Sequence, residues 1–235
     1  MMSLFHAPAL RAETIALATG EWIPYTSSGM EQFGEFTEQV TIVLAEMGMQ
    51  PEYRFYPWPR CFDSVLKGRV WAAFPYSHTE ERAKKVLFST PLSCSKTVFF
   101  YYGKDSDKEP YRFDRLEDLR DYIVGGVAGY FYEELFQKAG LDVDYASDEI
   151  SGLEKLKRGR VDLMPVNEKV GRHLIQTHFP DDIDRFHTLS RPMSLDSLHL
   201  IVSKSYPDAE KILLRFNATL QQCREKGLVH IPECR

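Results

Sequence analysis

The chain has 235 residues, of which 43% are hydrophobic, 13% aromatic and 27% charged. This composition supplies enough apolar side chains for a core and excludes a disordered linker, and the length fits one large domain or two small lobes. Lysine and arginine total 29 against 34 aspartates and glutamates, and no basic stretch collects them, so nucleic acid and anionic membranes are not expected partners. The longest apolar runs are far shorter than the roughly 20 residues of a membrane-spanning helix.

The first residues form a short apolar stretch followed by small residues in an Ala-x-Ala arrangement. This pattern is typical of the end of a secretory signal peptide, so residues 1–12 are expected to be a signal-peptide remnant or a tag. The mature protein is then expected to begin near Leu10 or Glu13 and to be periplasmic. An ordinary N-terminal tail is the alternative.

The four cysteines are an even number, which an exported protein can pair in three ways. We expect Cys223 to pair with Cys234, because the two flank a predicted helix end at Gly227 and close a loop of about a dozen residues. Neither Cys-x-x-Cys nor His-Glu-x-x-His occurs in the sequence, and the seven histidines are scattered. No metal site and no cofactor are expected.

Strands and helices alternate in the first part of the chain. Apolar and β-branched runs predict strands, and apolar residues at spacings of three and four predict helices that stop at glycines. In chain order these elements are expected at residues 14–19 (strand), 33–47 (helix), 52–56 (strand), 62–66 (helix) and 70–74 (strand). Such alternation predicts a parallel sheet covered by helices.

The same order of elements recurs further along the chain. It is expected at residues 122–127 (strand), 132–139 (helix), 142–145 (strand), 149–157 (helix) and in a strand that ends at Pro165. Both series contain a similar local pattern at the same point, Leu66–Val70 in the first and Leu156–Val161 in the second. We therefore predict two similar α/β lobes.

Two β-prone runs connect the predicted lobes. Residues 97–102 lead from the first lobe to the second, residues 198–203 lead back, and a helix at residues 207–226 closes the chain. We expect the first lobe to comprise residues 13–98 and 197–235, and the second lobe residues 99–196. Two crossing strands form a hinge, and the cleft between the lobes is the natural ligand site.

Residues that follow the predicted strands are candidates for ligand contact, because open parallel sheets bind ligands beyond the carboxyl ends of their strands. Arg82 lies in the first turn of a short helix for which Thr79 is a plausible N-cap. With free backbone N–H groups it would hold an anion, most simply a carboxylate in a bidentate fork. The alternative is that Arg82 pairs with Glu80 on an exposed helix face. Trp22 and Tyr25 belong either to the cleft or to the core.

Two further features point to the cleft. Three successive aromatics at residues 130–132 cannot all point inward, so at least one is expected to face solvent or a ligand. Arg60 lies at a predicted helix start, where the macrodipole favours anions, so its guanidinium is expected to reach for a ligand or an acidic partner. The full set of candidate ligand-binding residues is Glu21, Trp22, Tyr25, Arg60, Phe74, Tyr76, Ser77, Arg82, Gly129, Tyr130, Phe131 and Asn167.

Several motifs occur in order along the chain: Ile15 to Tyr25, Tyr56 to Arg60, Leu66 to Arg69, Thr79 to Arg82, Phe88 to Leu92, Gly126 to Gly129 and Gly159 to Asp162. Together they resemble the type 2 periplasmic solute-binding proteins of the polar amino-acid ABC transporter group, also called bacterial extracellular solute-binding proteins of family 3. The similarity covers nearly the whole chain beyond residue 13. The resemblance implies an α/β fold of two lobes, each a mostly parallel sheet flanked by helices, joined by two crossing strands.

The resemblance also implies roles for single residues. Arg82 would hold the α-carboxylate of the ligand and Ser77 would support it. Trp22 or Tyr25 would line the pocket for the ligand's side chain.

The chain departs from the pattern of the family at two places. Asn167 stands where an aspartate commonly binds the ligand's ammonium, and Tyr130 and Phe131 stand where small hydroxyl residues are common. A neutral amide makes a weaker hydrogen bond with an ammonium than a carboxylate does. Glu21 is an alternative source of negative charge. Ammonium recognition is therefore open, and aromatic walls favour a ligand with a flat or apolar part.

These observations predict an extracytoplasmic binding protein, not an enzyme. We expect a monomer that captures a small carboxylate-bearing solute, an amino acid or a related compound, and delivers it to the membrane permease of an ABC transporter. Alternatives are a ligand-sensing module for a signalling partner and a dehydratase-type enzyme on the same fold. Only Glu21, Glu168 and His78 are placed to act as acid or base, and none has a partner at a useful spacing.

Overall fold

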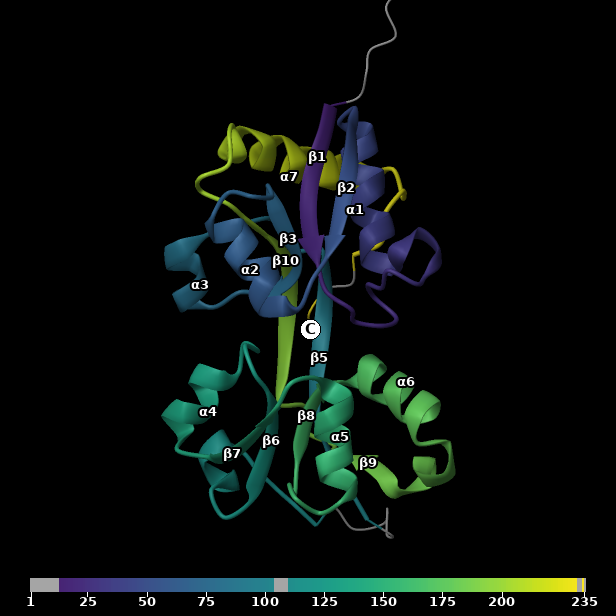
Figure 1. Cartoon of the computed structure of the whole chain (residues 1–235), viewed down its shortest axis with the longest axis vertical. Coiled ribbons are helices and arrows are strands. Elements are labelled where there is room, and N and C mark those ends of the chain that lie inside the picture. The colour runs from purple at the N-terminus through teal and green to yellow at the C-terminus, as the bar shows by residue number, and fades with distance from the viewer. Residues whose placement is uncertain (1–12, 104–109, 232–233, 235) are drawn as a thin grey trace, which may run out of the picture.

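The computed structural model describes residues 13–103, 110–231 and 234 and has two lobes, one above the other in Figure 1. The N-terminal strands and the C-terminal helix form the upper lobe, and the middle of the chain forms the lower lobe. This arrangement confirms the predicted two-lobed α/β fold. The expected signal-peptide remnant at residues 1–12 lies outside the described residues.

The first lobe is built around strand β1, which pairs in parallel with β2 on one side and β3 on the other. Every residue of β3 is buried, which fits its small and aromatic side chains at the centre of a sheet covered on both faces. The elements of this lobe are β1 (Glu13–Thr19), η1 (Glu31–Phe33), α1 (Glu35–Glu46), β2 (Met49–Phe55), α2 (Trp58–Leu66), β3 (Ala72–Ser77), α3 (Glu80–Lys85), β4 (Leu87–Phe88) and α7 (Ala209–Glu225).

Two long strands, β5 (Ser93–Tyr102) and β10 (Ser194–Val202), run side by side from one lobe into the other (Figure 1). They are antiparallel to each other, and β10 also pairs with β3 while β5 pairs with β8. One hydrogen-bonded path, β2-β1-β3-β10-β5-β8, therefore runs through both lobes. The predicted lobe boundaries at residues 98/99 and 196/197 fall inside these strands and stay a prediction.

The second lobe contains the parallel pair β6 and β7, and a parallel bridge between Val124 and Leu163 places the start of β8 beside β6. Helix α6 and strand β9 had not been predicted. Helix α6 packs closely on Phe100 of strand β5 at Gly171. A Cβ at this position would lie 2.6 Å from the Phe100 ring, so a larger residue would collide with it. The elements are η2 (Leu116–Leu119), β6 (Ile123–Val127), α4 (Glu133–Ala139), β7 (Asp142–Ala146), α5 (Glu149–Lys157), β8 (Met164–Asn167), α6 (Glu168–His178), η3 (Pro180–Arg185) and β9 (Phe186–Thr188).

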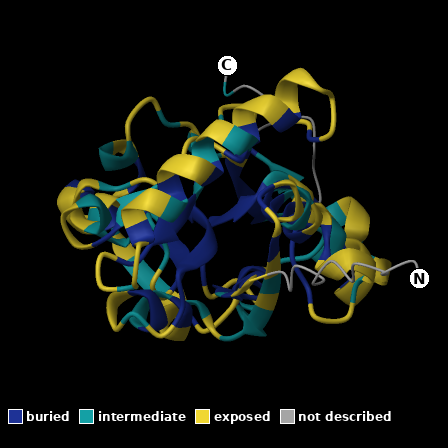
Figure 2. Ribbon diagram, turned by 90° about the horizontal axis from the view of Figure 1, so that it is seen from above, coloured by how far each residue is buried: buried dark blue, intermediate teal, exposed yellow. Residues whose placement is uncertain are grey.

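Buried residues gather on the central strands and on the inward faces of the helices, whereas the outer helix faces are exposed (Figure 2). Helix α7 shows the pattern that its sequence predicts, with Leu213, Phe216, Leu220 and Cys223 buried on one face. The helix begins at Ala209, two residues after the predicted start at Pro207.

The predicted disulfide between Cys223 and Cys234 is wrong. Cys234 pairs with Cys94 at the start of β5, across a sequence separation of 140 residues. Cys223 is free and only 1% exposed, because its position on the apolar face of α7 directs it into the core. The short loop between Cys223 and Cys234 therefore did not predict the pairing. The observed bond connects the C-terminal segment to strand β5, which crosses between the lobes.

Candidate ligand-binding site

A cavity of about 80 Å³ lies between the two lobes, at the carboxyl ends of β1, β3, β6 and β8. This is the place where parallel sheets bind ligands, so we take it as the candidate site in preference to two wider surface grooves of about 600 and 590 Å³. The lining residues are Trp22, Trp58, Pro75, Tyr76, Ser77 and Arg82 from the first lobe, Ser95, Thr97 and Leu198 from the crossing strands, and Gly129, Tyr130, Phe131, Tyr132, Pro165, Val166 and Asn167 from the second.

Arg82 spans the cleft from the first lobe to the second. The Thr79 hydroxyl accepts a hydrogen bond of 3.2 Å from the Arg82 backbone N–H, which confirms the predicted N-cap of α3. The guanidinium donates to the Ser77 carbonyl oxygen at 3.0 Å and to the Gly129 carbonyl oxygen in the second lobe at 3.3 Å. It also lies 5.1 Å from the centre of the Tyr76 ring.

The charge of Arg82 has no acidic partner of its own. Among the described residues, none forms an ion pair with it, whereas Glu81 pairs with Lys84 and Lys85 on the solvent side of α3. Burial lowers the pKa of Arg82, while Tyr76 and the more distant Glu133 act to raise it. A desolvated cation without a counter-ion favours the binding of an anion.

The aromatic walls come from both lobes. Trp22 lines the cavity, but Tyr25 is only 5% exposed and stacks on Phe36 with the ring centres 4.6 Å apart, so Tyr25 belongs to the core of the first lobe. Trp58 lines the cavity as well and packs edge-on against Tyr76. It had not been counted as a site residue, although its place directly after the carboxyl end of β2 was a usable signal.

Glu149 lies behind the wall of the cavity and connects the lobes. It is the first residue of α5, 9% exposed, and its Oε1 accepts a hydrogen bond from the Tyr130 hydroxyl. The indoles of Trp22 and Trp58, from the first lobe, act to lower the pKa values of Glu149 and Tyr130 respectively, so both lie near this pair. Burial raises the pKa of Glu149, and the Tyr130 hydroxyl and the Trp22 indole oppose that rise. Its position after β7 and its N-cap Asp148 were the only signals in the sequence.

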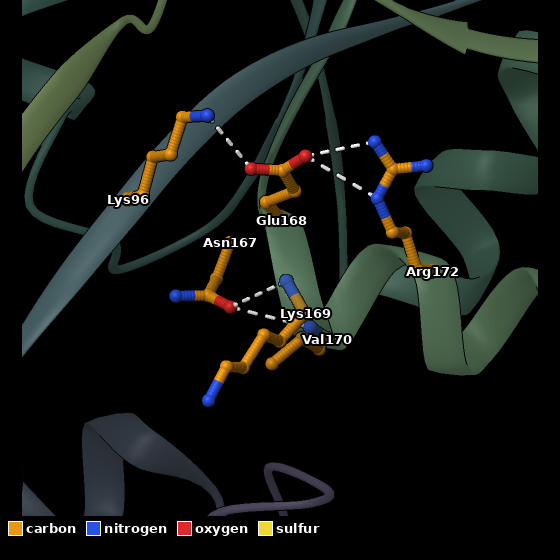
Figure 3. A network of polar contacts seen from close by, with 6 residues as sticks. All are labelled: Lys96, Asn167, Glu168, Lys169, Val170 and Arg172. Atoms are coloured by element: carbon orange, nitrogen blue, oxygen red, sulfur yellow. Dashed lines mark hydrogen bonds and ion pairs between the residues drawn. The ribbon is translucent and has the colours of Figure 1, made fainter.

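Asn167 is fully engaged by its own lobe and the hinge. Its Oδ1 accepts from the backbone N–H groups of Lys169 and Val170 at 3.1 and 3.2 Å, so it caps helix α6 (Figure 3). Its Nδ2 donates to the Ser95 hydroxyl at 2.9 Å. The next residue, Glu168, pairs with Lys96 of strand β5 at 2.9 Å (Figure 3).

Besides Tyr25, three more of the candidate residues lie away from the cavity. Glu21 is exposed, and its Oε1 accepts hydrogen bonds from the N–H and hydroxyl of Ser28. These bonds outweigh partial burial and lower the pKa of Glu21. Arg60 is exposed and lies 4.1 Å from the centre of the Tyr56 ring, and Phe74 is fully buried in the core. The other candidates, Ser77, Gly129 and Phe131, line the cavity as expected.

Metal-ligating side chains do not cluster within the described ranges, where no group of three or more His, Cys, Asp or Glu residues is placed to hold an ion. The helices of these same ranges are each too short or too polar to cross a membrane.

The fold is that of the two-lobed periplasmic binding proteins. The family model of bacterial extracellular solute-binding proteins, family 3, matches residues 20–230. The chain therefore belongs to this family, whose members are extracytoplasmic binding proteins. A comparison with curated proteins found no match.

Solved structures show the same fold at low sequence identity. A histidine kinase sensor domain with similarity to periplasmic binding proteins has 24% identity and a TM-score of 0.78, with 93% of each chain covered. An ancestral arginine-binding protein bound to arginine has 19% identity and a TM-score of 0.75, covering 93% of this chain and 95% of that one. The substrate-binding protein of an amino acid ABC transporter has 18% identity and a TM-score of 0.70, covering 91% and 94%.

Proposed function

We propose that the protein captures a small carboxylate-bearing solute between its two lobes. The observation that carries this proposal is Arg82, a half-buried guanidinium at the cavity that lacks an ion-pair partner among the described residues. A carboxylate in the cavity would accept two parallel hydrogen bonds from this fork. Ser77, which also lines the cavity, would add a hydroxyl donor.

Closure of the lobes is the proposed means of capture. The two crossing strands, β5 and β10, act as the hinge, and contacts that exist only when the lobes meet select the closed state. The hydrogen bond from Arg82 to Gly129 is such a contact, so the group that holds the ligand would also report on closure. Affinity in the micromolar range, about −8 kcal/mol, would suit capture followed by release.

Delivery of the solute to the permease of an ABC transporter, by a periplasmic and monomeric protein, is the role we propose on the basis of family membership. Sensing is the second candidate. It is favoured by one observation, the similarity of the fold to a histidine kinase sensor domain. In both roles the protein binds its solute without converting it.

A thermal-shift screen of amino acids and simple carboxylates tests the proposal, because a ligand that binds only the native state raises its stability by mass action. We expect stabilisation by at least one carboxylate, and we expect Arg82→Ala to abolish it. Arg60→Ala is the matched control, since Arg60 lies outside the cavity and should leave binding unchanged. Equal shifts for wild type and Arg82→Ala would reject the anchor, and consumption of the ligand would reject a pure binding role.

A further inference from the structure

We infer that the ligand of the cleft is a carboxylate that carries no ammonium or other cationic group, such as a short carboxylic acid with an aromatic or branched aliphatic body. This inference deepens the proposed function and rests on it. Two observations point to a carboxylate without a cationic group: the wall of the cavity is positively charged, and the acceptor atoms of Asn167 and of the nearby acids are already hydrogen-bonded.

The cavity wall is cationic. Arg82 is the one charged side chain that lines it within the described part of the chain. A carboxylate alone neutralises this guanidinium, whereas a zwitterionic amino acid would bring a second cation into the same small, desolvated space. A buried cation without an anionic partner is strongly disfavoured.

Asn167 does not compensate for the missing acid. Its amide oxygen accepts two backbone N–H bonds as the cap of α6, which occupies both lone pairs (Figure 3). Its amide nitrogen donates to the Ser95 hydroxyl. An ammonium, which has three donors and no acceptor, would find no free acceptor at this residue.

The acids nearest to the cavity are engaged elsewhere. Glu149 accepts a hydrogen bond from the Tyr130 hydroxyl, which lies between it and the cavity. Glu133 lines the outer groove at the mouth of the cleft and accepts a hydrogen bond from the Gly129 N–H at 2.9 Å. Asp196 on β10 accepts from the Ser194 hydroxyl, and Glu21 faces Ser28. None of these acids lines the cavity, so each would have to leave its present partner to bind an ammonium.

The rest of the wall suits the body of such a carboxylate. Tryptophan, tyrosine, phenylalanine, proline, valine and leucine side chains make up most of the lining, and they would cover an aromatic or branched aliphatic group. The hydroxyls of Ser77, Ser95 and Thr97 also belong to the wall, and each can donate to a carboxylate oxygen.

Titration calorimetry with matched pairs of ligands tests the inference on the wild-type protein. Each pair differs only by the ammonium: 3-phenylpropionate against phenylalanine, and 4-methylpentanoate against leucine. We expect the member without the ammonium to bind at least about tenfold more tightly, because the cavity wall offers the ammonium no anionic partner. Equal or tighter binding of an amino acid would overturn the inference but leave the proposed carboxylate site intact. If no carboxylate of either kind binds, the proposed function itself is rejected.

A charge-changing variant gives an independent readout. Aspartate caps helices as well as asparagine does, so Asn167→Asp should fold normally while it adds a negative charge beside Ser95. We expect the preference for the deaminated ligand to fall by at least about tenfold in this variant. Asn167→Ser, a neutral cap, should keep the preference. An unchanged preference in Asn167→Asp would overturn the assignment of selectivity to the missing charge.

Discussion

The guanidinium of Arg82, in the first lobe, donates a hydrogen bond of 3.3 Å to the carbonyl oxygen of Gly129, in the second. The same side chain is held at 3.0 Å by the carbonyl oxygen of Ser77, within its own lobe. One cation therefore joins the two walls of the cavity. Three other features, namely Glu149, the disulfide and the cap of α3, yield four measurable predictions.

The first prediction concerns Glu149, which accepts a hydrogen bond from Tyr130 of its own lobe and lies near Trp22 of the other. Glu149→Ala should destabilise the contact between the lobes by about 1–3 kcal/mol, because it leaves buried donors without an acceptor. Small-angle scattering of the ligand-free protein should show a larger radius of gyration. Glu149→Gln keeps an acceptor and should stay compact, and Glu154→Gln on the exposed face of α5 is the control. An unchanged radius for Glu149→Ala would show that Glu149 does not hold the lobes together.

The second prediction concerns pH. Burial raises the pKa of Glu149 above its ordinary value of 4.5, so the folded, closed state binds a proton that the unfolded state has released in the window above that value. The contribution of Glu149 is therefore fully present below the ordinary pKa and is lost as pH rises through the raised pKa. Urea unfolding of wild type and Glu149→Gln across pH 4–8 should show the wild type losing stability relative to the variant as pH increases. A difference that does not change with pH would mean that Glu149 has an ordinary pKa.

The third prediction concerns the disulfide between Cys94 and Cys234. Cys94→Ser with Cys234→Ser should lower the free energy of unfolding by up to about 5 kcal/mol, because the bond closes a long loop in the unfolded chain. Thiol titration of the denatured, unreduced protein should find the two free cysteines, Cys61 and Cys223. A tryptic peptide that links Cys223 to Cys234 would contradict the structure.

The fourth prediction concerns the cap of α3, in which the Thr79 hydroxyl accepts from the Arg82 N–H. Thr79→Ala should cost about 1 kcal/mol of stability. It should also weaken binding of a carboxylate found in the screen, since the start of the helix positions the guanidinium. Thr79→Ser keeps the hydroxyl and should behave as wild type in both urea unfolding and calorimetry. Full affinity in Thr79→Ala would show that α3 does not depend on its cap to present Arg82.

Elements with strong local signals were predicted well. The helix at residues 149–157 has the bounds of α5, and Thr79 caps α3 as expected, because caps and apolar periodicity act over only a few residues. Helix α6 was missed. Its glycine, Gly171, fits against Phe100 of strand β5, and nothing near it in the sequence indicates that contact.

Only some residues of the cavity were predicted correctly, because their positions also depend on contacts between distant parts of the chain. Arg82 and Trp22 line the cavity, but Tyr25 and Phe74 pack in the core, and Trp58 and Glu149 were not counted. Each of these outcomes depends on which face of an element meets the other lobe. Strand ends indicate the edge where a ligand binds, yet they do not specify the orientation of each side chain there.

The sequence by itself determined the class of the protein: enough apolar residues for a core, two α/β series, two crossing strands and the motifs of one family, all readable from local pattern and order. The opening choice between one domain and two lobes was settled in the same way. Only the tertiary structure decided which distant residues meet, namely Cys94 with Cys234 and Glu149 with Trp22. The physical reason is that a pair contact depends on how the lobes fold and approach each other, and local propensity carries no information about that.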